Sequence, residues 1–424
     1  MNQSNFAEWS KSRLVTFRLL FCYLLCYFIF LSDFFVQFIP FLEYVHTPFK
    51  FISDNLVGLV NTLFIHKKYA TDIYTGIGDT SWFFMASFSY LGLSILATVI
   101  WTFLDKRCNH NNLLFYLYTY SRYYLSFALL VYGLSKLYNT QFPEVPPDYL
   151  MHPLRNIDSH SLLWAFMAAS KSYNVFGGIL ETTVAILLLF RRTATLGALV
   201  ALFTLLNILL LNIGYDTLVK AFVAHLILIS FFILSPVINK LFNFFLTSRS
   251  TTLTTVSIKN SLDKNKLLRF GLKFIIISFF AFKLISFQTN QAKNLSKSYL
   301  NGLDGFYETT EFYKNGQTLQ PLTTDTVRWR RLAINRWGYV SVQLMNDSII
   351  QYSSLGDTAA KFIELSLWND STFKSRLHYS SLNPTDYLFE GQYKNDSIKI
   401  ICRKINLHNY PLLKDKGKVK WVWW

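Results

Sequence analysis

Charged and amide side chains occur inside long apolar runs of this sequence, where burying them in lipid is costly. An ionisable residue at the centre of a membrane helix costs about 2.5–3.5 kcal/mol on insertion scales, so it usually faces a protein interior. The residues of this kind in the apolar runs, or at their ends, are Lys136, Glu181, Asn207, Asn212, Asp216, Lys220 and His225. They predict a cluster of polar groups inside a bundle of helices.

The spacing of these residues predicts that the polar groups share one half of the bundle. At a rise of 1.5 Å per residue, Glu181 and His225 each lie roughly 12–14 Å below the outer ends of their segments. The functional hypothesis is a polar pocket in which these two residues exchange protons or hold a polar headgroup. The alternative is internal neutralisation, in which Asp216 bonds Lys220, four positions along the same helix face, and Glu181 bonds Lys136 or His225.

Two aromatic residues complete the candidate pocket. Tyr132 lies four positions before Lys136, on the same helix face. Trp164 lies in residues 160–170 (HSLLWAFMAAS), which are too few to cross a membrane and are expected to form a helix at its surface, with Trp164 as a headgroup anchor. A second surface helix is expected at residues 49–64, whose apolar side chains recur at helical spacing.

Seven apolar runs are long enough, or nearly so, to cross a bilayer. A span needs about 20 mostly apolar residues, and a backbone in lipid must satisfy its own hydrogen bonds, so such runs form helices. The composition agrees, because 52% of the residues are hydrophobic and only 16% are charged, against about 25% in soluble domains. The runs cover residues 14–39, 82–104, 114–137, 173–190, 194–213, 217–236 and 270–288.

Lysines and arginines gather in the loops on one side of these seven spans. They precede the first span, follow the second and the fourth, and separate the sixth from the seventh, whereas the other loops carry mixed charge. The positive-inside rule therefore predicts a cytoplasmic N-terminus and a C-terminal domain on the outer side, which in a bacterium is the periplasm. Because this signal and dispersed charges account for the net charge of +16, nucleic acid is not an expected partner.

From about residue 294 the sequence changes to the period-two alternation that is typical of strands. Asn-Asp pairs at 346–347, 369–370 and 395–396 supply turn residues between several of them. Short turns between consecutive strands predict an antiparallel meander or a small barrel. The predicted strands are residues 306–313, 327–334, 339–344, 349–354, 362–367, 373–379, 387–393, 398–403 and 419–423.

Outside the membrane spans, cationic and aromatic residues are most concentrated at residues 328–331. Arg328, Trp329, Arg330 and Arg331 could bind anionic headgroups or a polyanionic partner. The alternative is that they are ordinary strand residues whose arginines face water. The cysteines and histidines have no metal-ligand spacing, so the sequence predicts neither a metal site nor a haem.

Several stretches in the third to sixth spans match a known pattern. They are residues 132–136 (YGLSK), 141–143 (QFP), 162–167 (LLWAFM), 176–181 (FGGILE), 187–192 with 195–198, and 212–220 (NIGYDTLVK) with His225-Leu226. Taken together they resemble the DoxX-like family of bacterial membrane proteins. The resemblance implies a four-helix membrane module over about residues 113–236. The family takes its name from a subunit of a thiosulfate:quinone oxidoreductase, and this chain adds two N-terminal spans, a seventh span and the β domain.

The sequence therefore predicts a transmembrane helical domain at residues 1–290 and a periplasmic β-rich domain at residues 291–424. The first functional hypothesis is a bacterial inner-membrane protein whose bundle binds a quinone or another lipid-like molecule, in a redox system. The alternative is a non-enzymatic anchor or assembly protein that presents the β domain. The expected partners are the lipid bilayer with either a small amphipathic ligand or proteins of the envelope.

Overall fold

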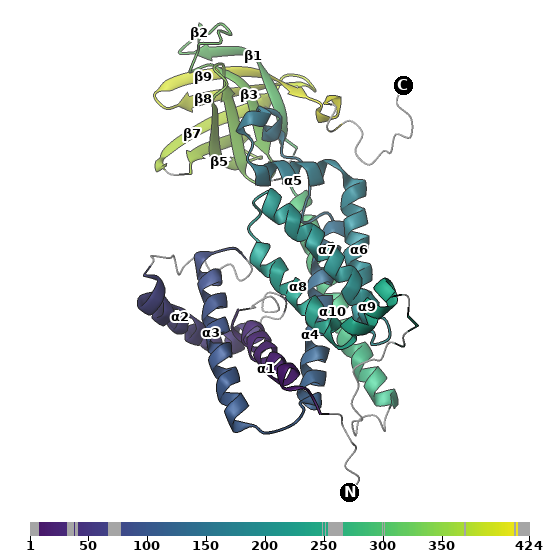
Figure 1. The fold of residues 1–424 in the computed structure, drawn as a ribbon. Helices are drawn as coiled ribbons and strands as arrows, with labels where there is room; N and C mark the ends of the chain where they lie inside the picture. Colours follow the sequence, from purple (N-terminus) through teal and green to yellow (C-terminus); the bar gives the residue numbers. More distant parts are fainter. Residues whose placement is uncertain are drawn as a thin grey trace. The chain divides into compact units, whose positions relative to one another are not determined.

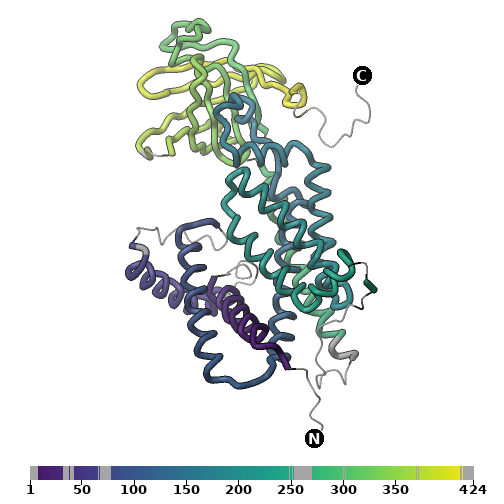
Figure 2. The backbone as a smooth tube through the Cα atoms, in the orientation of Figure 1, coloured from purple at the N-terminus to yellow at the C-terminus, as the bar shows by residue number. Residues whose placement is uncertain are grey.

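The computed structural model describes most of the chain, and it divides the chain into two compact units that we consider separately (Figures 1 and 2). The helical unit consists of Met1–Leu134 and Gly177–Ser286, and the barrel unit consists of Ser135–Phe176 and Phe287–Trp424. The described residues are 8–31, 38, 41–66, 78–247, 249–250, 252, 266–298, 300, 302–368, 370–410 and 413.

The helices of the structure follow the apolar runs of the sequence. Within the helical unit α1 packs on α3, and α7 packs on α8. α1 continues into a π-helical turn, and α8 continues through a short 3-10 turn into α9. The bounds are α1 Lys11–Cys26, α2 Phe41–Val60, α3 Ser81–Leu104, α4 Asn111–Leu137, α5 Ser159–Ala169, α6 Lys171–Leu189, α7 Ala194–Gly214, α8 Lys220–Leu234, α9 Ile238–Thr247 and α10 Lys266–Ser296.

Among the described residues, six segments are long and apolar enough to cross a membrane, and the chain is a multi-pass membrane protein. They confirm six of the seven predicted spans. The seventh, predicted at residues 114–137, forms α4, whose 27 residues are also long enough to cross at 1.5 Å per residue. Its tyrosines and Arg122 make it less apolar than the other six. The six segments are Lys11–Leu31, Ser81–Leu104, Lys171–Leu189, Ala194–Gly214, Lys220–Thr247 and Phe270–Ser296.

Both short helices predicted in the loops are present. α2 covers the predicted residues 49–64 in part and packs one face on α3, where Ser53 is fully buried and hydrogen-bonded to Tyr90. Its other face exposes large apolar side chains such as Phe51, which is 70% exposed. α5 is an 11-residue helix whose first turn is capped by Asp158, since its carboxylate accepts a hydrogen bond from the backbone N–H of Ser161 at 2.9 Å.

The predicted meander closes into a small antiparallel barrel. Eight strands form the barrel, because β1 pairs with β3 on one side and with β9 on the other (Figure 1). The ninth strand, β2, pairs only with the end of β1. The bounds are β1 Gly305–Lys314, β2 Gln317–Thr318, β3 Trp329–Asn335, β4 Tyr339–Leu344, β5 Ile349–Asp357, β6 Phe362–Leu367, β7 Asp370–Ser381, β8 Asp386–Tyr393 and β9 Asp396–Ile405.

Eight predicted strands coincide with the strands of the barrel, and the ninth prediction, residues 419–423, lies outside the described residues. β2 and the turn before it were not among the predicted elements. In this turn Asn315 and Gly316 both have positive φ, at 50° and 80°, as a two-residue hairpin turn requires. Two of the predicted Asn-Asp turns lie a residue too late, because Asp370 already begins β7 and Asp396 already begins β9. Lys394, with φ 55°, and Asn395 form the second of these turns.

Side chains fill the interior of the barrel. Trp329, Tyr307 and Tyr352 are each at most 1% exposed and belong to one apolar core. Two leucines from the segment that follows α10, Leu300 and Leu303, belong to the same core. The barrel is therefore a packed core and not a ligand-holding lumen.

Candidate functional site

The residues of the predicted polar pocket are divided between the two compact units. Lys136 and Trp164 belong to the barrel unit. The other candidates belong to the helical unit, namely Tyr132, Glu181, Asn207, Asn212, Asp216, Lys220 and His225.

His225 contacts two tyrosines, Tyr23 of α1 and Tyr27 of the π-helical turn that continues it. Its Nδ1 lies 2.7 Å from the carbonyl oxygen of Ala221, and its Nε2 lies 2.8 Å from the hydroxyl of Tyr23. Because a carbonyl only accepts, Nδ1 donates, and in the neutral ring Nε2 then accepts from Tyr23. The ring stacks on Tyr27, with centroids 4.4 Å apart. Both nitrogens are thus engaged by α8 itself and by α1. The sequence signal that could have indicated these contacts is the spacing of Tyr23 and Tyr27, which lie one helical turn apart.

An acidic residue from a distant loop caps α8. Lys220 forms the predicted ion pair with Asp216 at 2.7 Å, and its ammonium also lies 3.6 Å from Asp79. The carboxylate of Asp79 accepts hydrogen bonds from the backbone N–H groups of Lys220 and Ala221, both at 2.8 Å. Negative charge at a helix N-terminus is stabilising. Sequence reasoning missed this role of Asp79 because the cap comes from 141 positions earlier in the chain.

The remaining polar residues of the helical unit have different exposures. Glu181 is 2% exposed and Asn212 is 6% exposed. The side-chain oxygen of Asn212 accepts a hydrogen bond from the Thr217 hydroxyl at 2.8 Å. Asn207 instead lies on the exposed face of α7. Five residues turn an α-helix by about 500°, so Asn207 and Asn212 cannot share a face.

The cationic cluster at residues 328–331 is built into the barrel. Trp329 is 1% exposed in the barrel core. Arg328 is 4% exposed, and its guanidinium donates to the carbonyl oxygens of Leu319 and Thr310. Arg330 pairs with Asp347 at 2.6 Å, and Arg331 pairs with Glu308 at 3.2 Å. Each of the four residues thus has structural partners within the barrel unit.

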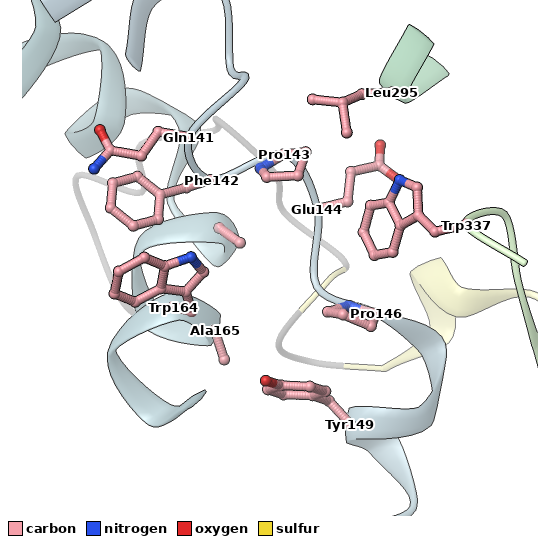
Figure 3. A pocket seen from close by; sticks show the side chains of 11 residues that line it. Gln141, Phe142, Pro143, Glu144, Pro146, Tyr149, Trp164, Ala165, Leu295 and Trp337 are labelled. Atoms are coloured by element: carbon pink, nitrogen blue, oxygen red, sulfur yellow. The ribbon is translucent and has the colours of Figure 1, made fainter. Parts of the chain in front are cut away.

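A pocket of about 280 Å³ lies within the barrel unit and is lined mainly by aromatic rings and prolines (Figure 3). Residues that the resemblance had singled out contribute much of its wall, from the stretches 141–143 and 162–167. Trp337 and Leu295 come from outside the resemblance. The lining residues are Gln141, Phe142, Pro143, Glu144, Pro146, Tyr149, Trp164, Ala165, Ala168, Leu295 and Trp337.

The loop after α4 is held by side-chain hydrogen bonds. Asn139, in the left-handed conformation at φ 57°, ends the helix. Its side-chain nitrogen donates to the carbonyl oxygen of Pro143 at 2.6 Å, and its side-chain oxygen accepts from Asn174 at 2.8 Å. Thr140 bonds Gln288 of α10 at 2.6 Å. These contacts, with the fixed φ of the prolines, position the Gln141–Tyr149 wall of the pocket.

Three rings, of Phe142, His160 and Trp164, pack together on one side of the pocket. His160 and Trp164, one turn apart on α5, stack with ring centroids 3.9 Å apart. Phe142 meets the indole of Trp164 edge to face at 5.1 Å, and Figure 3 shows the two rings beside each other on this side of the pocket. Such pairs add about 0.5–1.5 kcal/mol beyond the burial of their area. Phe142 and Trp164 give this side of the pocket a wall of packed aromatic rings.

The turn between β3 and β4 provides the facing side of the pocket. Arg336 forms ion pairs with Glu144 at 3.3 Å and with Asp304 at 3.7 Å, so it ties this turn to the loop. Trp337 presents its ring to the pocket (Figure 3). Its indole N–H is buried and has no acceptor among the described residues. An unsatisfied buried donor of this kind costs about 1–3 kcal/mol.

The next residues of the loop dock on the outer face of the barrel. Met151 packs with Phe306 and Ala333 in a small apolar cluster, in which all three are at most 3% exposed. Beside it, Asp148 is 5% exposed and accepts a hydrogen bond from the hydroxyl of Tyr339 at 3.3 Å. Burial raises the pKa of the Asp148 carboxyl above its ordinary value. The loop and the barrel therefore form one packed body.

Replacing Asp148 by asparagine is expected to change how stability depends on pH. A carboxyl whose folded pKa is raised contributes stability below its unfolded pKa, about 3.9, and loses it as pH rises through the folded pKa. The Asp148→Asn protein should therefore melt close to the wild type near pH 4 and at a higher temperature at pH 8. Thermal unfolding of both full-length proteins in detergent measures this, and a pH-independent difference would contradict it.

Comparisons with known proteins give one partial match. The chain is 37% identical over 95 residues to the uncharacterized protein YwoB of Bacillus subtilis (strain 168), and the match covers 22% of this chain. The chain spans 60% of the length of that curated relative. No family model matches the chain, and no solved structure matches it. Within the described part of the chain, no three His, Cys, Asp or Glu side chains are grouped as metal ligands would be.

Proposed function

We propose that this chain is a DoxX-like protein of the bacterial inner membrane that binds an amphipathic molecule, a quinone or another lipid, in the aromatic pocket of its barrel unit. The charge distribution of the loops supports a cytoplasmic N-terminus and a barrel unit on the outer side. The observation that carries the proposal is the pocket itself, with flat rings on its walls and one buried donor, Trp337, lacking an acceptor among the described residues.

The shape and chemistry of the pocket favour such a ligand. Binding pockets are mostly apolar and fix their ligand with a few polar groups. The rings of Phe142, Trp164 and Trp337 can hold a quinone ring or the upper part of an acyl chain. A quinone or ester carbonyl would accept from the indole N–H of Trp337. Glu144 is neutralised by Arg336, so a net charge on the ligand is not required.

Binding of a short-tail benzoquinone to the purified full-length protein in detergent tests the proposal. Trp337→Phe keeps an aromatic ring and removes the donor, so it should weaken binding by roughly 2- to 10-fold, the value of one hydrogen bond. Trp164→Ala should weaken it further by removing one of the aromatic rings that form the wall of the pocket. Trp368→Phe is the matched control, because Trp368 is 64% exposed on the same unit and does not line the pocket.

The outcomes separate this site from the predicted polar pocket of the helical unit. Unchanged affinity in both Trp337→Phe and Trp164→Ala would rule out the aromatic pocket as the binding site. Loss of binding in Glu181→Gln or His225→Phe, with Trp337→Phe unaffected, would instead assign the ligand to the helical unit. Mass spectrometry of lipids extracted from the purified protein shows whether a quinone accompanies it in stoichiometric amount.

A second candidate function is a non-enzymatic membrane anchor that presents the barrel to proteins of the envelope. It is favoured by the filled interior of the barrel, which leaves the outer surface as the part available to partners. Under this proposal, a chain without its barrel fails to restore the phenotype of cells that lack the protein, whereas the Trp337→Phe and Trp164→Ala proteins restore it. A phenotype that is lost in those two point variants would favour the binding function.

A further inference from the structure

A second cavity, of about 420 Å³, lies within the helical unit. It is formed where the first turns of α1 meet the beginning of α4 and the end of α8. The residues that line it form an apolar part and a polar part. Phe17, Leu114 and Phe232 are apolar and at most 8% exposed, and they form the floor. Arg13 and Asn239 are exposed and polar, and they lie at the mouth with three serines.

Among the described residues that line the cavity there is one cation, Arg13, and an aromatic ring holds it in place. The guanidinium carbon of Arg13 lies 4.3 Å from the centroid of the Trp9 ring, a distance typical of a cation–π contact. Trp9 is itself fixed, since it is 7% exposed, its backbone N–H donates to the carbonyl oxygen of Cys108 at 3.0 Å, and its ring packs edge to face on Phe17. The arginine is thereby preorganised at the mouth.

No carboxylate balances this cation within the described part of the cavity. The lining residues include no Asp or Glu, and Glu8, the nearest acid along the chain, is not one of them. Arginine binds phosphate through a fork of N–H donors, and serine and asparagine side chains add hydrogen bonds. The mouth therefore has the chemistry to bind an anionic phosphate group, and the floor has the chemistry to hold an apolar chain.

The neighbouring helix places this mouth at the level of lipid headgroups. α8 ends at Leu234, Pro236 lies in the 3-10 turn that follows it, and α9 is a short amphipathic helix. On α9, Ile238, Leu241, Phe242 and Phe245 recur at helical spacing, and the first, third and fourth of them are at least 46% exposed. The span Lys220–Thr247 has 28 residues, more than the about 20 that cross the hydrocarbon, so α9 at its end reaches the membrane interface, where amphipathic helices lie. Asn239, which lines the cavity, belongs to the first turn of this helix.

We infer that this cavity is a binding site for an anionic phospholipid, with the phosphate on Arg13 and one acyl chain along Phe17, Leu114 and Phe232. Further cations lie at the same helix ends, Lys11 on α1 and Lys240 on α9, and basic residues near the membrane surface attract anionic lipid. This site is separate from the aromatic pocket of the barrel unit, so its test is independent of the proposed function.

Native mass spectrometry of the full-length protein in detergent, titrated with phosphatidylglycerol or phosphatidylcholine carrying identical oleoyl chains, tests the inference. The wild type should retain phosphatidylglycerol more strongly. Arg13→Gln should lower that retention by about tenfold or more, the value of a hydrogen bond to a charged group. Lys11→Gln, which removes a nearby cation that does not line the cavity, should lower it by less than about twofold.

A second pair of variants tests the cavity and not only the charge. Thr16→Trp fills the cavity from its exposed wall and should displace the lipid. Val15→Trp adds the same bulk at a neighbouring exposed position that does not line the cavity, and it should leave binding unchanged.

Three results would overturn the inference. They are equal retention of the two lipids by the wild type, equal losses in Arg13→Gln and Lys11→Gln, and equal losses in the two tryptophan variants. Binding of inorganic phosphate to the same proteins is measured as well. If phosphate alone binds in an Arg13-dependent manner while phosphatidylglycerol does not, the site takes a free anion and not a lipid.

Discussion

The Trp329→Ala protein is expected to lose about 3–5 kcal/mol of barrel stability, the range for removing a large aromatic side chain from a packed core. The ring is 1% exposed and lies 5.4 Å from Tyr393 edge to face and 6.4 Å from Phe312, measured between centroids. Its removal leaves a cavity lined by rings that cannot collapse without moving several strands. Chemical denaturation of the full-length protein in detergent, followed by the near-ultraviolet circular dichroism of the aromatic side chains, measures the loss.

Arg330→Ala is the matched control from the same strand. Its side chain is 39% exposed and pairs with Asp347 near the surface, and exposed pairs contribute about 0–1 kcal/mol. If residues 328–331 formed a headgroup site, Arg330→Ala would reduce binding to anionic vesicles at unchanged stability. A Trp329→Ala protein as stable as the wild type would contradict the packed-core role that the structure gives to this residue.

The Gly133→Leu protein is expected to lose the close contact between α4 and α6. A Cβ atom at Gly133 would lie 2.5 Å from the Thr182 hydroxyl oxygen and 2.8 Å from the Thr182 backbone nitrogen. A side chain can turn away, but a helix backbone cannot, so the two helices must separate. Small residues allow such close approach between membrane helices, and overpacking costs about 1–3 kcal/mol or more.

The thermal stability of the detergent-solubilised protein, measured by the loss of its monodisperse peak on heating, tests this expectation. Gly92→Leu is the matched control, because Gly92 also lies in a membrane-spanning helix, α3, and a Cβ there would have no atom within 4 Å. Leucine also has the higher helix propensity, by up to about 1 kcal/mol, so this control should be neutral or slightly stabilising. Similar melting of the two variants would contradict a close α4–α6 contact.

The sequence by itself determined where the helices and strands lie. Lipid requires a backbone to satisfy its own hydrogen bonds, so a long apolar run can only be a helix, and six of the seven predicted spans are confirmed on that ground. The strands follow from an alternation that consecutive residues carry themselves, and eight of the nine predicted strands coincide with the barrel. Both signals are local, and neither requires knowledge of what packs against the element.

Only the tertiary structure decided which residues far apart in the chain contact one another. The barrel closes because β1 pairs with β9, about 90 residues later, and the sequence left open whether the meander would close. Asp79 caps α8 from 141 positions earlier in the chain, and Tyr23 bonds His225 across 202 positions. The aromatic pocket combines Trp164 with Trp337. No local pattern connects such pairs, because each contact depends on which faces of distant elements pack together.

The cluster at residues 328–331 shows the physical reason most directly. Counting back from Leu332, which faces the barrel core, strict alternation would place Arg330 inside and Trp329 outside. The register shifts between Trp329 and Arg331, and such a bulge adds one residue to a strand and reverses the side on which the preceding residues face. Trp329 is therefore in the core, and Arg330 pairs with Asp347 near the surface. The sequence determined that a strand is here, and the pairing with β4 decided which of its faces is inside.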